Sequence, residues 1–154
     1  MKMKFWQRKS VLRFAFIGYC ILMLWLLFIR SRDITVTDYW LQVAQRINLV
    51  PFASIGSMLR NLRENPRWDV LWVVVYNLGG NIGMFLPLGM LLPALFPGPR
   101  RFGKCMLTVA AIMTTVEILQ LLTLRGFCET DDVFLNLIGA CIGYGFWKLF
   151  LKQK

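Results

Sequence analysis

The stretch "CMLTVAAIMTTVEILQLLTLRGFCETDDVFLNLIGACIGYGFWKLFL", residues 105–151, holds two apolar runs on either side of a short charged turn. The runs, 105–124 and 133–151, each have about the 20 residues that a helix needs to cross roughly 30 Å of hydrocarbon. Most charges of the stretch lie in the turn, as is typical between the spans of a membrane protein. The stretch therefore predicts two membrane-spanning helices joined at one face of a bilayer.

Two further apolar runs, at 11–29 and 70–96, also have the length of membrane spans. The second contains Pro87 and Pro93, so we expect this helix to be tilted or kinked. The first follows a basic start but lacks a small-residue cleavage site, which favours an uncleaved signal anchor over a signal peptide. With 154 residues, 57% of them hydrophobic, the chain is predicted to be an all-α membrane protein, a four-transmembrane-helix bundle.

The charge distribution predicts the orientation of the bundle. The chain carries 18 Lys and Arg against 8 Asp and Glu, a net charge of +10. In a soluble protein this would suggest nucleic-acid binding, but here the positive charge gathers on one side of the spans, as the positive-inside rule requires. We therefore expect no nucleic-acid partner, and both termini in the cytoplasm, with residues 1–10 as a cytoplasmic segment. The basic residues on that side are Lys2, Lys4, Arg8, Lys9, Arg13, Arg100, Arg101, Lys104, Lys148, Lys152 and Lys154.

The first outer loop, residues 30–69, is predicted to contain two short amphipathic helices. Its apolar residues follow helical spacing in two groups, Trp40, Val43, Ala44 and Ile47, and then Ile55, Met58, Leu59 and Leu62. Thr37 or Asp38 could cap the first helix and Ser54 the second, which the Asn-Pro pair at 65–66 would end. With arginines on their other face, these helices would lie on the outer leaflet; a small soluble cap is the alternative.

Three of the predicted spans carry one polar stripe each. The stripes are Asn77 with Asn81, Glu117 with Gln120, and Asp132 with Asn136. A spacing of three or four puts each pair on one helix face, and the helical rise puts all three stripes at matching depths in the outer half of the bilayer. The amides alone could simply hydrogen-bond the helices together. A buried carboxylate, however, costs about 2.5 kcal/mol or more and usually marks function, so Glu117 predicts one shared outward-facing pocket.

Acidic residues crowd beside Arg125 at the start of the last span. Asp131 or Asp132 could cap that span and complement its helix dipole. Such a cap accounts for one of the two aspartates. Because both aspartates lie beside Arg125 and above Glu117, we interpret this segment as the rim of the predicted pocket.

Small residues favour close packing around this pocket. Gly139 and Gly143 form a GxxxG pair in the last span, and Gly79, Gly80 and Gly83 flank the asparagine stripe. Packing explains these glycines, so we expect no chemistry from them.

The four cysteines show no metal-ligand spacing, and the chain has no histidine. We expect Cys20, Cys105 and Cys141 to be small buried hydrophobes and only Cys128 to be exposed. Without a histidine base or another activating partner, Cys128 is not predicted to be a catalytic nucleophile.

Four segments with their order and spacing resemble the VanZ-like family. They are "NLVPF" (48–52), Asn77 with "NIGMFLPLG" (81–89), "EILQ" (117–120) and "RGFCETDDVFLNLIGACIGY" (125–144). The resemblance implies a VanZ-like domain at about 48–147, in a small integral protein of the bacterial cell membrane. Relatives are associated with resistance to glycopeptide antibiotics, teicoplanin in particular. The motif residues carried over are Asn48, Pro51, Asn77, Asn81, Pro87, Gly89, Glu117, Gln120, Arg125, Asp131, Asp132, Asn136 and Gly139.

The hypothesis that we favour from the sequence is a binding or accessory protein. Its pocket would take a cell-envelope lipid headgroup or peptide precursor, or would dock a partner envelope enzyme, and Arg125 could meet a phosphate through a bidentate contact. Besides the bilayer and this ligand, a second copy of the chain is a possible partner. The predicted ligand-binding residues are Asn77, Asn81, Glu117, Gln120, Arg125, Asp131, Asp132 and Asn136.

Two alternatives stay open. A membrane-embedded enzyme could act on a lipid-linked envelope substrate, with Glu117 and Asp131 or Asp132 as an acid/base pair. No cofactor is evident, although the same three carboxylates could instead hold Mg²⁺, Mn²⁺ or Ca²⁺, which prefer oxygen ligands. A small transporter or flippase is the third hypothesis, in which a homodimer would supply more spans.

Overall fold

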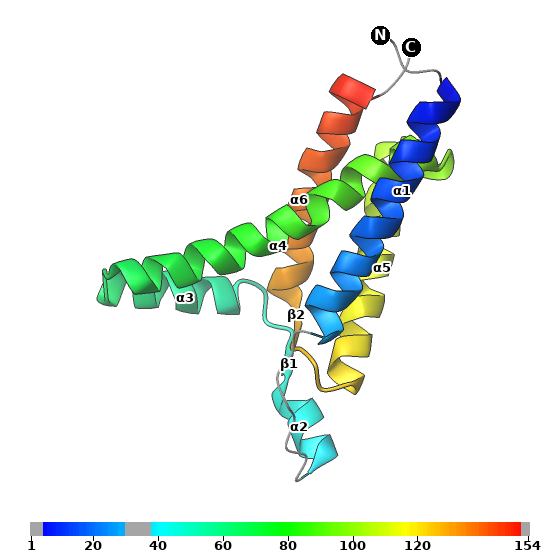
Figure 1. Ribbon diagram of the computed structural model, residues 1–154. Helices are drawn as coiled ribbons and strands as arrows, with labels where there is room; N and C mark the ends of the chain where they lie inside the picture. The colour runs from blue at the N-terminus through cyan, green and yellow to red at the C-terminus, as the bar shows by residue number, and fades with distance from the viewer. Residues whose placement is uncertain (1–4, 30–37, 152–154) are drawn as a thin grey trace.

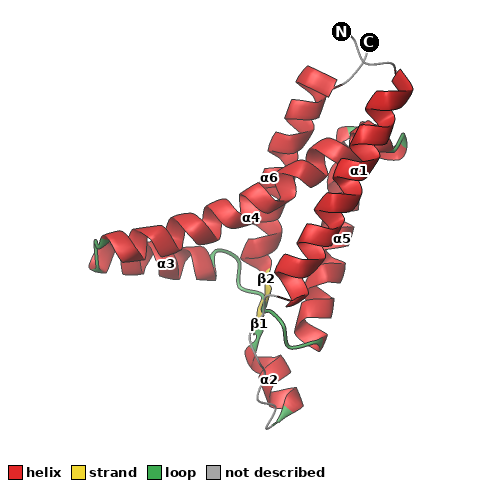
Figure 2. Cartoon of the chain, in the orientation of Figure 1, coloured by secondary structure: helices red, strands yellow, loops and turns green. Residues whose placement is uncertain are grey.

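The computed structural model describes residues 5–29 and 38–151, and these are almost entirely helical (Figures 1 and 2). Within the described residues, four helical segments are long and apolar enough to cross a membrane, which confirms the predicted all-α fold with four spans. These segments are Lys9–Ile29, Trp68–Leu95, Phe102–Leu122 and Thr130–Leu151. The helices that form them are α1 (Phe5–Leu24) with the π-helical η1 (Trp25–Ile29), α4 (Trp68–Leu95), α5 (Phe102–Leu122), and α6 (Thr130–Phe146) with the π-helical η3 (Trp147–Leu151).

Helix α4 is the centre of the bundle, because it packs against α1, α5 and α6. It remains one helix through Pro87 and Pro93 and crosses α6 steeply, as Figure 1 shows. Its N-terminal half leaves the other spans together with α3 (Ala53–Glu64), and the two helices form an arm at the side of the bundle. The short 3-10 helix η2 (Gly98–Arg100) connects α4 to α5.

The outer loop is tied to the turn between α5 and α6 by a pair of two-residue strands. Strand β1 (Ile47–Asn48) pairs in parallel with β2 (Cys128–Glu129), so that Ile47 lies opposite Cys128 and Asn48 opposite Glu129. The sequence did not predict this pairing, and the assignment of Ile47 to a helix was wrong. The end of the bundle that carries β2 and the α5–α6 turn (residues 123–129) is called the turn end below.

The two helices of the outer loop form where the sequence places them. Helix α2 (Tyr39–Gln45) begins after Asp38, whose carboxylate accepts the backbone N–H of Leu41 at 3.1 Å, so this predicted cap is confirmed. Thr37, the alternative cap, lies outside the described residues. Helix α3 ends at Glu64, just before the Asn-Pro pair, as predicted.

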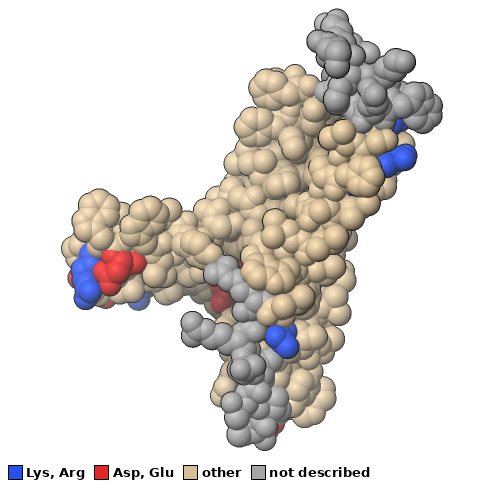
Figure 3. All heavy atoms as spheres, in the orientation of Figure 1, with Lys and Arg blue, Asp and Glu red and all other residues tan. Residues whose placement is uncertain are grey.

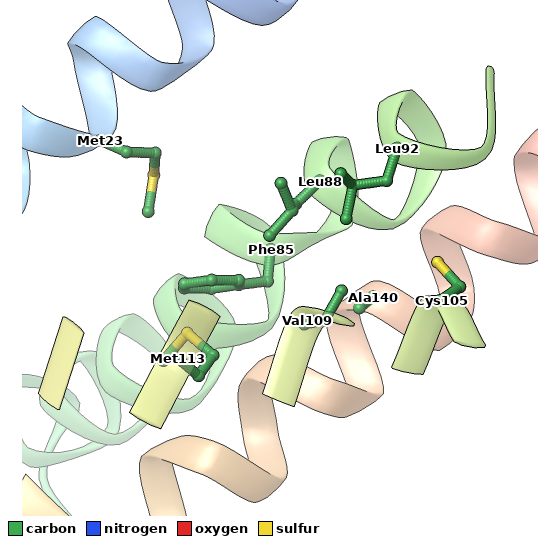
Figure 4. Close-up of a cluster of buried hydrophobic side chains, with 8 residues drawn as sticks. All are labelled: Met23, Phe85, Leu88, Leu92, Cys105, Val109, Met113 and Ala140. Carbon is green, nitrogen blue, oxygen red and sulfur yellow. The ribbon is translucent and has the colours of Figure 1, made fainter. Parts of the chain in front are cut away.

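The buried core draws side chains from all four spans (Figure 4). Within it, Cys105, Val109 and Met113 recur every four residues along one face of α5, and Phe85 and Leu88 of α4 face them. The remaining members are Met23, Leu92 and Ala140. Large apolar side chains elsewhere on the spans point outward, as expected for helices whose surroundings are lipid.

Glycines let α4 and α6 approach until their backbones touch. A Cβ atom on Gly139 would overlap the carbonyl oxygen of Ile82, and one on Gly143 would overlap that of Leu86. Gly89 of α4 lies against the backbone of Ala140 in the same way. The predicted role of Gly139 and Gly143 in close packing is therefore confirmed. The packing role predicted for Gly79, Gly80 and Gly83 was wrong, because a Cβ on any of them would meet no atom within 4 Å.

Candidate functional site

A cavity of about 340 Å³ lies between the spans near the turn end. Its walls come from η1, α3, α4, α5, the turn and α6, so every span contributes to it. The polar residues of all three predicted stripes line this one cavity. They are Asn77, Asn81, Glu117, Gln120, Asp132 and Asn136.

The cavity forms where the polar parts of α4 and α6 face each other. On α6, Asp132 and Asn136 share a face with Gly139 and Gly143, since the spacing of four, three and four residues follows the helix repeat. The glycines hold the helices together, and the polar residues begin one turn beyond this contact. There the Asn81 side-chain amide donates a hydrogen bond to the Asp132 carboxylate and links the two spans.

Glu117 lies on α5 with only 5% of its surface exposed. The backbone N–H of Glu129 donates to its carboxylate. Its Oε2 atom and the Oδ1 atom of Asn136, which is 2% exposed, are the only buried side-chain polar atoms in the described chain that have no hydrogen-bond partner. Each such atom costs about 1–3 kcal/mol in a folded protein, so the pair points to a ligand or solvent that donates hydrogen bonds.

Negative charge dominates the cavity. Glu117, Asp132 and Glu129 all line it, and Glu117 interacts electrostatically with both of the others. Among the described residues, no Lys or Arg lines it. Figure 3 shows red atoms where the arm meets the bundle, while the blue atoms in that view lie at the outer end of the arm, near the upper end of the bundle and near the turn end. Glu129 was not among the predicted site residues; the sequence signal for it is only its place beside the two aspartates.

Gln120 has a structural role in the wall of the cavity. Its Nε2 atom donates to the Leu27 carbonyl oxygen at 3.1 Å and so ties α5 to η1 at the end of the first span. Gly126 lies against the same side chain, where an added Cβ would come within 3.1 Å of the Gln120 Cβ. The contact with Leu27 fixes the orientation of this amide.

Asp131 is buried, but its carboxylate does not line the cavity and instead accepts hydrogen bonds at the start of helix α3. The backbone N–H groups of Phe52 and Ile55 donate to its two oxygens, the second at 3.0 Å. Asp131 thus caps α3 from another helix, because the N-cap residue Phe52 offers no side-chain cap. The caps predicted for α3 and α6 were wrong: Ser54 does not cap α3, and neither aspartate caps α6, whose N-cap is Glu129.

Arg125 is exposed on the turn and does not line the cavity, so it is not placed to hold a phosphate there. A different arginine organises the turn. Arg46 donates to the Leu124 carbonyl oxygen, and its guanidinium lies 5.5 Å from the centre of the Phe127 ring. Nothing near Arg46 in the sequence indicates this contact, which joins residues 78 positions apart.

The chain matches the protein family described as VanZ/LLP1 over residues 16–151. It belongs to the VanZ/LLP1 family. The matched range starts inside the first span, well before the motifs that begin at Asn48, and this span does supply Leu27 to the cavity wall. A search of curated proteins finds no match, and a search of solved structures finds none either.

The first VanZ motif, residues 48–52, organises the entry into α3. The Asn48 side chain donates to the Ser54 hydroxyl at 3.1 Å and also accepts from the Val50 backbone N–H at 3.4 Å. Phe52 adopts a left-handed backbone (φ 61°), which is strained for a bulky residue. Its bond to Asp131 and its stacking on Phe134, at 5.5 Å between ring centres, hold it there.

The cysteines of this VanZ protein differ in part from expectation. Cys105 is buried, whereas Cys141 is exposed on its span and Cys20 and Cys128 are half-buried, so the prediction that only Cys128 is exposed was wrong. The reason is that an apolar run in a membrane protein faces lipid as well as core. Burial raises the pKa of the Cys128 thiol, and the negative charge of Glu117 raises it further.

The carboxylates predicted to hold a metal or to act as an acid/base set are only partly brought together. Glu117 and Asp132 share the cavity, but Asp131 does not. Among the described residues, no cluster of three or more His, Cys, Asp or Glu side chains is arranged to hold a metal ion. The family motif therefore divides into residues around the cavity and residues that brace the loop.

Proposed function

We propose that this VanZ/LLP1 protein binds a cell-envelope lipid or a lipid-linked envelope precursor in the cavity between its spans. The observation that carries the proposal is the pair of buried, unpartnered oxygens on Glu117 and Asn136 inside a membrane-spanning bundle. A fold retains such costly groups where they do something other than stabilise it. The surrounding Asn81 and Asp132 supply further polar contacts at the same site.

The size of the cavity supports a small group as the occupant. A volume of about 340 Å³ lies at the low end of the roughly 300–1,000 Å³ found for small-molecule sites. A lipid headgroup or the tip of a peptide stem fits this space, whereas a whole glycopeptide antibiotic does not. In the proposed role the protein lowers glycopeptide susceptibility, teicoplanin included, by holding an envelope component and not by capturing the drug.

The charge pattern supports an outer-leaflet position in a bacterial plasma membrane. The end of the bundle away from the turn carries four basic residues (Figure 1). They are Lys9 near the start of α1, Arg100 in η2, Lys104 at the start of α5 and Lys148 in η3. The positive-inside rule assigns that end to the cytoplasm. The cavity then opens toward the outer leaflet, where envelope precursors are used.

The test is the lipid that accompanies the purified protein. We expect mass spectrometry to find a specific envelope lipid or precursor with the wild type, and to find it strongly depleted in Glu117→Gln, which keeps the side-chain shape but removes the charge. Glu64→Gln is the matched control, because Glu64 is exposed at the end of α3, outside the cavity. The same lipid profile with all three proteins would refute the proposal.

The same variants test the family phenotype. Expression in a susceptible bacterium should raise the inhibitory concentration of teicoplanin for wild type and Glu64→Gln, but not for Glu117→Gln at equal abundance. If Glu117→Gln retains the full effect, the cavity does not carry the phenotype.

Catalysis on a lipid-linked substrate is the second candidate, favoured by the interacting pair of carboxylates, Glu117 and Asp132, in one cavity. One could donate and the other accept a proton, whereas Asp131 is engaged at α3. Turnover of a radiolabelled lipid-linked precursor by wild type, abolished in both Glu117→Gln and Asp132→Asn, would support it. Binding without turnover would leave the accessory role.

A further inference from the structure

The two unpartnered atoms of the cavity are of one chemical kind. Glu117 Oε2 is a carboxylate oxygen and Asn136 Oδ1 is an amide carbonyl oxygen, and both only accept hydrogen bonds. Both side chains are more than nine-tenths buried and both line the cavity. A ligand that satisfies them must therefore supply N–H or O–H groups.

The charge of the cavity selects among such donors. Glu117, Asp132 and Glu129 lie near one another, and no Lys or Arg among the described lining residues offsets them. A phosphate or carboxylate here would add another negative charge in a poorly solvated place. A cation would be attracted instead, and a buried carboxylate is stabilised by a charge-assisted hydrogen bond.

A primary ammonium group meets both requirements, since it carries a positive charge and three N–H donors. It is small enough for the polar part of the cavity, and the apolar side chains Phe85, Met113 and Phe127 on the other walls suit the methylene groups next to it. A quaternary ammonium has the charge but no donor, so it would leave Asn136 unsatisfied.

Resting on the proposed function, we infer that the cavity binds its ligand through a primary ammonium group and not through its phosphate. Glu117 and Asn136 accept its N–H groups, and Asp132 and Glu129 add favourable charge. The ammonium could belong to an aminated lipid headgroup or to a soluble amine.

The experiment compares lipids retained by the full-length protein in native mass spectrometry after exchange into micelles doped with one lipid. The probes are phosphatidylethanolamine, phosphatidylcholine, which has the ammonium charge without the donors, and phosphatidylglycerol, which has O–H donors but no positive charge beside its phosphate. We expect retention of phosphatidylethanolamine about tenfold above both others, a factor that corresponds to about 1.4 kcal/mol. Asn136→Leu and Glu117→Gln should remove the preference, and Glu64→Gln should keep it.

Free ethanolamine distinguishes the source of the amine. Specific retention of phosphatidylethanolamine that millimolar ethanolamine does not displace supports a lipid, whereas direct, Glu117-dependent binding of ethanolamine supports a soluble amine. Equal or stronger retention of phosphatidylglycerol, lost in Asn136→Leu, would overturn the ammonium inference and leave the proposed function standing.

The remaining outcomes are equally decisive. Glu117-dependent binding of Mg²⁺ or Mn²⁺ that displaces the amine would identify a divalent cation as the occupant and overturn the inference. If no probe is retained above the Glu117→Gln background, and no envelope lipid accompanies the wild type, the proposed function falls with it. Circular dichroism melting of each variant controls for folding.

Discussion

Helices α4 and α6 meet in two places that differ in how closely they pack and in how polar they are. At the crossing, Gly139 and Gly143 lie against the carbonyl oxygens of Ile82 and Leu86, and backbone packs closely on backbone. One turn nearer the turn end, the same helix faces line the cavity, where two oxygen atoms among the described residues, Asn136 Oδ1 and Glu117 Oε2 of α5, have no hydrogen-bond partner. One face of each helix thus changes from a packing surface to a site along its length.

The close contact at the crossing keeps the polar groups of the two helices in register. Because the backbones are in contact at the crossing, the separation of the helices one turn away is fixed, and Asn81 can reach Asp132. The crossing contributes stability, while the cavity costs stability through its unpartnered oxygens. Variants at the two places should therefore change stability in opposite directions.

The largest effect is expected at the crossing. Gly139→Ala places a methyl group on the Ile82 carbonyl oxygen, which is backbone and can move only with its helix. We expect the free energy of unfolding to fall by about 3 kcal/mol, measured by denaturant titration in mild detergent. Gly145→Ala, on the same helix with open space around it, is the matched control and should be neutral or slightly stabilising. Equal effects would show that the helices do not touch where the structure places the contact.

The next effect separates two neighbouring aspartates. Asp131→Asn removes the charge and one of the two acceptors that cap α3, so unfolding should become easier by about 2 kcal/mol. Asp132→Asn keeps an acceptor for Asn81 and relieves repulsion among carboxylates, so stability should change by less than about 0.5 kcal/mol. The same denaturant titration, with tryptic cleavage in α3 as a local probe, checks both. A reversed order would place Asp131 in the site and Asp132 in the scaffold.

How much of this could be predicted from the sequence depends on the range of the contacts. The three polar stripes were correctly grouped because helical periodicity puts Asn77 with Asn81 and Asp132 with Asn136, and span length sets their depth. Asp131 was misassigned because its partners Phe52 and Ile55 are 79 and 76 residues away, and only the folded chain brings them together. The turn held by Arg46 and the arm formed by α3 and α4 were missed for the same reason: each needs a contact between segments that no local pattern encodes.

A smaller effect should appear at the cavity, with the opposite sign. Asn136→Leu replaces a buried, unpartnered acceptor by an apolar group of similar size, so the protein should gain about 1 kcal/mol in unfolding free energy. The same variant should lose the lipid that accompanies the wild type. Thermal melting and lipid mass spectrometry on one preparation measure both. A destabilised variant would mean that the Asn136 oxygen has a partner that the fold needs.

The smallest expected effect is on the labelling rate of Cys128, which lies near the cavity and responds to the charge of Glu117. Burial and the charge of Glu117 raise the pKa of Cys128, so at neutral pH less of this thiol is ionised, and a membrane-impermeant maleimide should label it more slowly than an exposed thiol. Thr123→Cys with Cys128→Ala supplies that exposed comparison in the same turn. Glu117→Gln removes the second cause of the raised pKa and should speed labelling of Cys128 about twofold near neutral pH, with the difference shrinking as rising pH ionises the thiol in both proteins. An unchanged rate would mean that Glu117 carries no charge in the folded protein, which would remove the electrostatic reason for a cationic ligand while leaving the two acceptors in place.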